Sequence, residues 1–142
     1  MANVIPYAFR GELFTGTHNF ASGGDQFKLA LYTANPYDTS STVYVTTDEV
    51  SSAGGTNYTA AGNDLGSNAV VYATAVASCD FADTSWTSAT ITAAFGVICN
   101  DDKSDKVCVV LDFGGCKSCT TGTFTISFPS ATTAADAIIS MA

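Results

Sequence analysis

Apolar and polar residues alternate most regularly between residues 26 and 33. Successive side chains of a β-strand point to opposite faces, so this pattern predicts a strand with one face in a core and the other face wetter. The predicted core face carries Phe27, Leu29 and Leu31, and the predicted wetter face carries Lys28, Ala30 and Tyr32. The segment is therefore expected to form one strand of a half-buried sheet.

A short helix is predicted before this strand, over residues 6–15. Pro6 suits the first turn of a helix, and Gly16 can end it in a left-handed conformation. Three apolar side chains are expected to share one side of this helix: Phe9, Leu13 and Phe14.

Most of the remaining chain alternates short apolar runs with turn residues. Further strands are predicted over residues 42–46, 69–77, 88–99, 106–113, 121–128 and 137–141. Several short strands joined by turns, with almost no helix, favour an antiparallel arrangement. The sequence therefore predicts an all-β fold, a single antiparallel β-sandwich or jelly-roll-like domain over residues 1–142, with a short helix in the N-terminal segment 1–20.

Two connections and one strand have distinct signatures. Residues 100–106 form a charged, small tip between apolar flanks, which predicts a hairpin whose tip projects into solvent. The run of residues 107–111 lacks polar alternation and predicts a strand covered on both faces. Glycines and small polar residues between 51 and 68 predict a long loop with Tyr58 near its middle.

The charge of the chain limits its classes of partner. Its 142 residues include 13 acidic and 5 basic side chains, a formal net charge of −8. A nucleic-acid interface needs clustered Lys and Arg, so no nucleic acid is expected as a partner. No secretory signal and no apolar run of about 20 residues is visible, so we expect synthesis in the cytoplasm and no membrane contact.

Residues typical of catalysis are sparse. His18 is the only histidine, so any Ser-His-Asp or Cys-His arrangement must include it. It follows the predicted helix, where a side chain commonly caps or packs, and no nucleophile-elbow or phosphate-loop motif is present. We therefore predict no enzyme and no cofactor.

Five cysteines leave three interpretations open. Cys116 and Cys119 have the spacing of a metal knuckle, to which Cys99 and Cys108 could add two thiolates, although their places in predicted strands fit zinc poorly. Alternatively, Cys99 could pair with Cys108 across the hairpin and Cys116 with Cys119 across a two-residue turn, as disulfides. With these two disulfides formed, Cys79 would remain unpaired, either buried or linking two subunits. In the third interpretation most thiols are reduced core residues. We therefore predict possible disulfides among these cysteines, and we predict no metal site.

Two further groups have a structural interpretation that outweighs a binding one. Asp101, Asp102 and Asp105 could offer oxygen ligands to calcium, but they lack the EF-hand spacing and are expected at a solvated hairpin tip. Trp86 has a nearby carboxylate, as a sugar site would, but it is expected to plug the core.

The phrase GTHNFASGGDQFKLALYT, residues 16–33, is accompanied by short strand and turn phrases at residues 42–44, 49–50, 54–58, 86–87, 112–115 and 122–124. Together they resemble a group of small virion proteins of tailed bacteriophages, whose members look like capsid decoration (cement) proteins and minor head or tail components. The resemblance implies a structural virion protein that stabilises the outside of the capsid by non-covalent clamping. It also implies two partners, the major capsid protein and further copies of this chain in a homotrimer.

No binding residue can be transferred from that group, so contact residues are predicted from this chain alone. Apolar and aromatic side chains supply interface energy at low entropic cost. We predict contacts through Val4, Phe9, an exposed Tyr37 and Tyr58. The alternative function is a tail or fibre component, or a module that recognises a host surface, because sandwich folds serve all of these roles.

Overall fold

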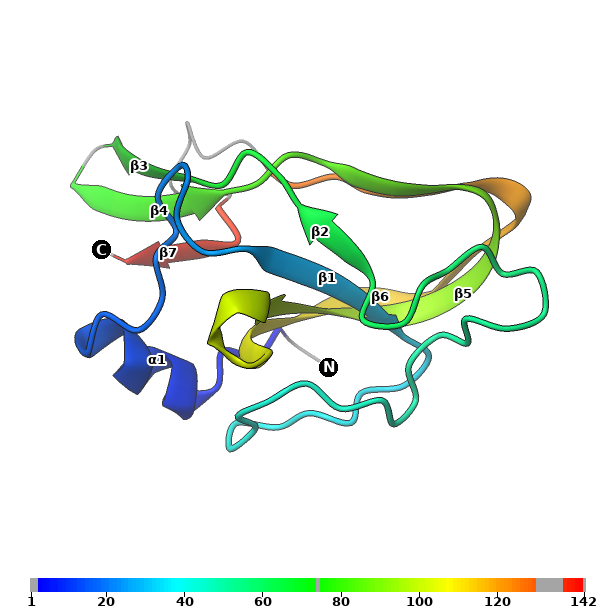
Figure 1. The fold of residues 1–142 in the computed structure, drawn as a ribbon, viewed down its shortest axis with the longest axis horizontal. Coiled ribbons are helices and arrows are strands. Elements are labelled where there is room, and N and C mark those ends of the chain that lie inside the picture. The colour runs from blue at the N-terminus through cyan, green and yellow to red at the C-terminus, as the bar shows by residue number, and fades with distance from the viewer. Residues whose placement is uncertain (1–2, 74, 130–136, 142) are drawn as a thin grey trace.

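The computed structural model describes residues 3–73, 75–129 and 137–141, and it is mainly β structure with one short helix (Figure 1). Along this part of the chain the elements are α1 (Tyr7–Phe14), β1 (Phe27–Tyr32), β2 (Asn63–Leu65), β3 (Ala69–Ala73), β4 (Val76–Asp80), β5 (Thr84–Asn100), the 3-10 turn η1 (Asp101–Lys103), β6 (Lys106–Ile126) and β7 (Ile139–Met141). The predicted antiparallel β fold with a short N-terminal helix is confirmed.

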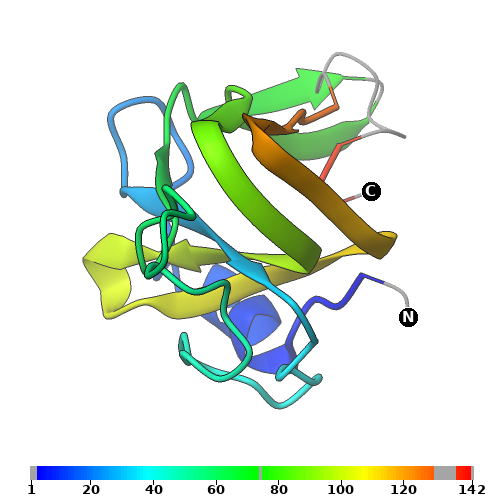
Figure 2. The same ribbon diagram turned by 90° about the vertical axis from the view of Figure 1, so that its right-hand side faces the viewer.

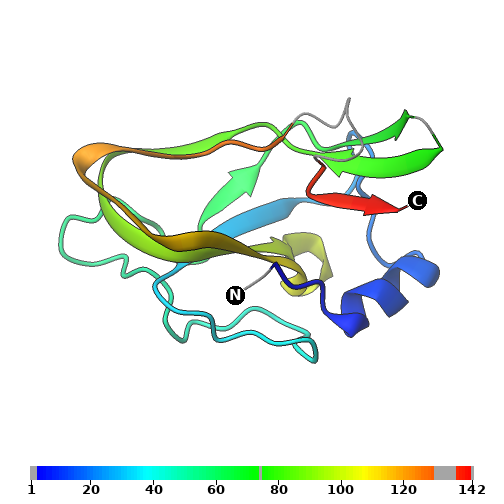
Figure 3. The same ribbon diagram turned by 180° about the vertical axis from the view of Figure 1, so that it is seen from behind.

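The strands form two antiparallel sheets in a β-sandwich-like arrangement. One sheet has the order β2-β1-β5-β6 and the other has the order β3-β4-β7. The long β5–β6 hairpin bends over at one end of the molecule, so its two halves lie in different layers (Figures 2 and 3). Apolar side chains from both halves therefore meet in one core, as with Trp86 and Phe124 on one half and Ile98 and Val109 on the other.

The structure joins two predicted strands into one. Separate strands are predicted for residues 106–113 and 121–128, but β6 continues from the first into the second and ends at Ile126. Its register with β5 shifts between Ala93 and Phe95, and Gly114 there takes a positive φ of 69°. A bulge of this kind inserts extra residues into one strand without ending the pairing, which explains why turn-like residues lie within a strand.

Two other strand predictions are wrong. Residues 69–77 form the hairpin of β3 and β4, with Ala75 at a positive φ of 65° in the connection. Residues 42–46 contribute only an isolated bridge between Val43 and Lys106. The predicted hairpin around residues 100–106 is confirmed, with η1 between β5 and β6.

Both faces of β1 are covered. Phe27, Leu29 and Leu31 are fully buried in the core between the layers, as predicted. The expectation of a wetter second face is wrong for Ala30 and Tyr32, which are buried in a second apolar cluster with residues of β5 and β6. Residues 107–110 of β6 are likewise buried on both faces, which confirms the prediction from their unbroken apolar run.

Candidate functional site

Three of the four predicted contact residues are buried within the chain. Phe9 is fully buried, and Tyr37 and Tyr58 are 6% and 3% exposed. The prediction that Tyr37 is exposed is wrong, because its hydroxyl lies 2.7 Å from that of Tyr32 in the second cluster. Val4 is half-buried and exchanges backbone hydrogen bonds with Val110 of β6. These side chains hold the chain together, so a contact surface must be sought elsewhere.

The loop that carries Tyr58 is fastened by one carboxylate. Glu49 accepts hydrogen bonds from the Tyr44 hydroxyl at 2.5 Å, the Tyr58 hydroxyl at 2.8 Å and the Ala61 amide at 2.7 Å. The Tyr58 oxygen in turn accepts the amide of Leu31 in β1 at 3.0 Å. Burial is the largest cause that raises the pKa of Tyr58, and the bond to Glu49 raises it further. These hydrogen bonds hold the loop against the sheet, so the cluster has a structural role.

A second polar cluster surrounds His18, whose side chain is fully buried. The Asn100 amide group lies 2.9 Å from His18 Nδ1 and also donates to Asp25 at 2.8 Å. Because that amide nitrogen can only donate, His18 Nδ1 accepts and Nε2–H donates to Glu12 at 2.8 Å. Lys106 of β6 pairs with the other oxygen of Glu12. His18 therefore packs and forms hydrogen bonds within the chain, which confirms the expected packing role.

This cluster predicts a loss of stability in acid. Burial raises the pKa of the Glu12 carboxyl, but hydrogen bonds from Lys106 and His18 outweigh burial and lower the pKa below its usual value. Burial also raises the pKa of Asp25, but the hydrogen bond from Asn100 helps to lower it below its usual value. A carboxyl with a depressed folded-state pKa stabilises the protein above its unfolded pKa and loses that contribution as pH falls through the folded value. Urea denaturation should show the free energy of unfolding falling between about pH 6 and pH 3, less steeply in Glu12→Gln. An unchanged slope in that variant would contradict the role of Glu12.

The cysteines lie too far apart, or on the wrong faces, for the predicted disulfides. Cys99 pairs with Val107 and lies in the second cluster, whereas Cys108 is the next residue along and points into the core between the layers. Cys116 and Cys119 are three positions apart within β6, which separates their Cα atoms by about 10 Å against a limit near 7 Å. All five thiols are free. Both predicted pairs are therefore wrong.

Thiol labelling should separate these cysteines by burial. Cys116 is exposed, Cys119 is half-buried with its Sγ 3.3 Å from the Ala89 carbonyl oxygen, and the other three are buried. Burial raises the pKa of Cys79 to about 12 and that of Cys108 well above its usual value, which suppresses the reactive thiolates. A maleimide followed by peptide mass spectrometry should label Cys116 first and Cys79, Cys99 and Cys108 only on unfolding. Rapid labelling of a buried thiol in the native protein would contradict this order.

The hairpin tip and Trp86 have structural roles. Asp101 forms an ion pair with Lys28 at 2.8 Å, and Asp102 accepts the Gln26 amide at 2.8 Å, so these carboxylates join the tip to β1. Trp86 is 4% exposed and packs near Tyr58 and Phe124, which confirms the prediction of a core plug. Among the residues that the structure describes, no group of three or more His, Cys, Asp or Glu side chains could hold a metal ion.

The strongest candidate for a contact surface is an apolar groove between α1 and β7. It has a volume of about 270 Å³ and is lined by Ile5, Phe9, Leu13 and Phe14 on one side and by Ile139 and Met141 on the other. We call it the α1–β7 groove. Phe14 is 92% exposed and Met141 is 58% exposed, so the groove has uncovered apolar rims.

Helical geometry explains why Phe14 lies at the rim. Five positions at about 100° each place Phe14 roughly 140° around the helix from Phe9. Phe9 therefore packs inward, 5.0 Å from the His18 ring and 6.0 Å from the Phe20 ring, while Phe14 faces solvent. The expectation that both share one side of the helix is wrong, and this angular separation was readable from the sequence.

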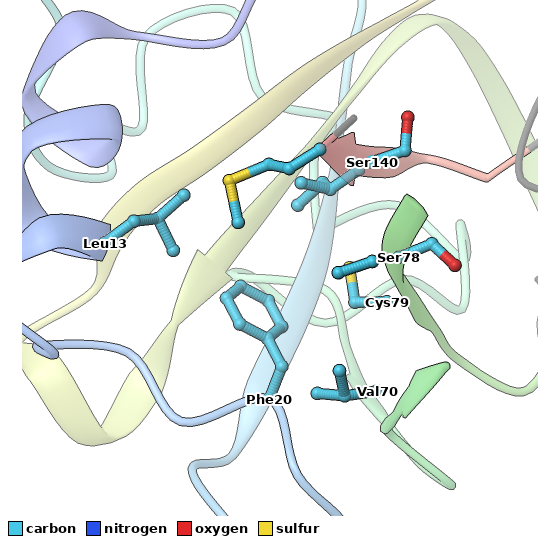
Figure 4. Close-up of a pocket in the computed structure, with 9 residues that line it drawn as sticks. Leu13, Phe20, Val70, Ser78, Cys79 and Ser140 are labelled. Carbon is cyan, nitrogen blue, oxygen red and sulfur yellow. The ribbon is translucent and has the colours of Figure 1, made fainter. Parts of the chain in front are cut away.

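A smaller pocket of about 90 Å³ continues the groove toward the second sheet (Figure 4). Leu13 of α1 and Phe20 of the following segment point toward the strands that carry Cys79 and Ser140. Leu13, Ile139 and Met141 line both hollows. The combined surface is suited to binding apolar side chains.

Arg10 is the charged residue that lines the α1–β7 groove. Lys28, Lys103 and Lys106 are each paired with a carboxylate, whereas no ion pair joins Arg10 to any residue in the described part of the chain. An unpaired guanidinium beside an apolar surface can accept a carboxylate in bidentate fashion. The groove therefore combines an apolar floor with one cationic contact.

Comparisons of the chain with protein-family models, curated proteins and solved structures gave no match. No helix in the described residues is both long and apolar enough to cross a membrane.

Proposed function

We propose that this chain is a structural protein of a tailed-bacteriophage virion that binds the outside of the capsid and stabilises it by non-covalent clamping. Its proposed partners are the major capsid protein and further copies of the chain in a homotrimer. The proposal also assigns a jelly-roll-like fold to the sandwich-like domain, in which the bent β5–β6 hairpin contributes to both layers. We expect no enzymatic activity.

The observation that carries the proposal is the exposed apolar rim of the α1–β7 groove. Phe14 exposes 92% of its surface, and Tyr7, about two turns earlier on the same face of the helix, exposes 57%. Exposed apolar side chains beside an apolar groove, on a protein with a net charge of −8, are typical of a site that another protein covers. An aromatic side chain at such a rim is the kind of residue that dominates binding energy at protein interfaces.

The polar clusters support a structural role in a second way. The side chains of His18, Glu12 and Glu49 are engaged with partners inside the chain. Their arrangement fastens α1 and the long loop to the sheets. A rigid body that presents an apolar groove fits a protein that clamps its neighbours.

The test adds the purified protein to undecorated capsids and measures the binding stoichiometry and the temperature at which the shells disrupt. We expect saturation at a fixed multiple of capsid subunits and a raised disruption temperature. Phe14→Ser should weaken binding about tenfold or more if Phe14 is a central contact. The matched control Val45→Ser, which also removes a partly exposed apolar side chain but lies outside the groove, should bind as the unaltered protein does.

Absence of binding to capsids would overturn the proposal. Binding of the same protein to tail structures or to host cells would then favour the alternative, a tail or fibre component or a recognition module. Equal losses in Phe14→Ser and Val45→Ser would leave capsid binding established but would remove the groove as its site.

A further inference from the structure

The edge of β7 that faces α1 is unpaired within the described part of the chain. In the order β3-β4-β7, β7 pairs with β4, with Ile139 opposite Cys79 and Met141 opposite Ala77. No other strand of the described chain bonds to β7. β7 lies between β4 and α1 in both the front and the rear views (Figures 1 and 3). An unpaired edge is a template on which another extended chain can add main-chain hydrogen bonds.

The wall opposite this edge is apolar and comes from α1, whose Phe9 and Phe14 lie about 140° apart around the helix. Phe9, Leu13 and Phe14 of α1 line the α1–β7 groove across from Ile139 and Met141. A strand added to β7 would point every second side chain toward this groove and the intervening ones away from it. The groove therefore selects a segment in which apolar residues recur at alternate positions.

Charge complementarity identifies a further feature of the occupant. Arg10 lines the groove and has no ion-pair partner among the described residues. The chain as a whole carries a net charge of −8, so a strongly acidic partner surface would be repelled outside the groove. A single carboxylate within an otherwise apolar segment satisfies both conditions.

We propose that the α1–β7 groove binds an extended segment of a partner protein, which adds as a strand to the free edge of β7, places alternate apolar side chains against α1 and presents a carboxylate to Arg10. In the setting of the proposed function, on which this inference rests, the segment belongs to the capsid subunit. The binding is non-covalent.

The first test selects displayed linear peptides of about 12 residues, long enough to add one strand, on the immobilised full-length protein. Peptides that also bind Phe14→Asp are removed. We expect the enriched peptides to alternate apolar residues and to contain an Asp or Glu. Enrichment of helical or basic peptides, or no enrichment over the Phe14→Asp control, would overturn the proposal.

Variants of one enriched peptide and of the protein then test the binding mode by fluorescence anisotropy. N-methylation of alternate peptide amides on the pairing edge should abolish binding, because it removes the donors of the added strand. Arg10→Ala should weaken binding about tenfold, as loss of a charge-assisted contact does, while the control Lys117→Ala, an exposed cation outside the groove, should not. Binding that tolerates N-methylation would contradict strand addition, and equal effects of both cation variants would contradict the role of Arg10.

The capsid assay separates this inference from the proposed function. If capsids bind and the peptides fail these tests, the function stands and strand addition at β7 is wrong. If neither capsids nor peptides bind, both fail. If sedimentation shows that two copies cover the groove in a stable dimer that Phe14→Asp dissolves, the occupant is a second copy and the proposal is overturned.

Discussion

Phe9→Ala is expected to lower the free energy of unfolding by about 3–5 kcal/mol, the range measured for a large buried aromatic residue. Phe9 is fully buried and packs against both His18 and Phe20. Its removal leaves a cavity beneath α1, next to the polar cluster that joins the helix to β6. Urea denaturation followed by far-UV circular dichroism would measure the change.

Phe14→Ala is the matched control for Phe9→Ala. Both replace a phenylalanine of the same helix, but Phe14 is 92% exposed, so the free energy of unfolding should change by no more than about 0.5 kcal/mol. Equal losses in the two variants would mean that Phe14 packs inward and would remove the exposed rim on which the docking proposals depend. The expected outcome separates folding, which depends on Phe9, from binding, which we assign to Phe14.

Gly62→Ala is expected to lower the free energy of unfolding by about 3 kcal/mol or more, because strain and overlap add at this site. Gly62 has a φ of +78°, and a Cβ built on it would lie 1.7 Å from the carbonyl oxygen of Leu29 in β1. The overlap is with backbone, which cannot move aside without displacing the strand. Since β2 begins at the next residue and pairs with β1, the substitution should also loosen β2.

Gly55→Ala separates backbone strain from steric overlap as causes of the loss. Gly55 has nearly the same φ, +76°, but a Cβ there would meet no atom within 4 Å. It should therefore cost only the left-handed backbone penalty, about 1–2 kcal/mol. Chemical denaturation of both variants gives the comparison, and a Gly62→Ala loss no larger than that of Gly55→Ala would contradict the close approach of the loop to β1.

Local sequence patterns were enough to predict a helix or strand where neighbouring residues share one environment. The alternation of residues 26–33 predicted β1, and the Pro6 and Gly16 signals bracketed α1 within about one residue of Tyr7–Phe14. The apolar run at 107–111 predicted a strand covered on both faces, and the small charged segment at 100–106 predicted a hairpin connection. In each case the signal depends on side-chain period or backbone preference, which act over a few residues.

Strand boundaries within the long hairpin could not be predicted in this way. Glycines near residue 114 are typical of turns, but in β6 they occupy a bulge, and pairing with β5 continues past it. Whether such residues end a strand depends on a partner strand more than 20 positions away, such as Ala93 opposite Lys117. Local preference alone does not contain that information.

The sequence by itself determined the class of fold, the covering of both faces of the strand at residues 107–110 and the packing roles of His18 and Trp86, because hydrophobic period and residue type act locally. Only the tertiary structure decided which side chains remain available for contacts. Tyr58 is buried because the long loop folds onto β1, and Tyr37 is buried because the segment after β1 packs it against Tyr32. Cys99 and Cys108 face different clusters because the hairpin pairs Cys99 with Val107. The α1–β7 groove depends on β7 lying beside a helix more than 120 residues earlier in the chain, a proximity created by long-range packing.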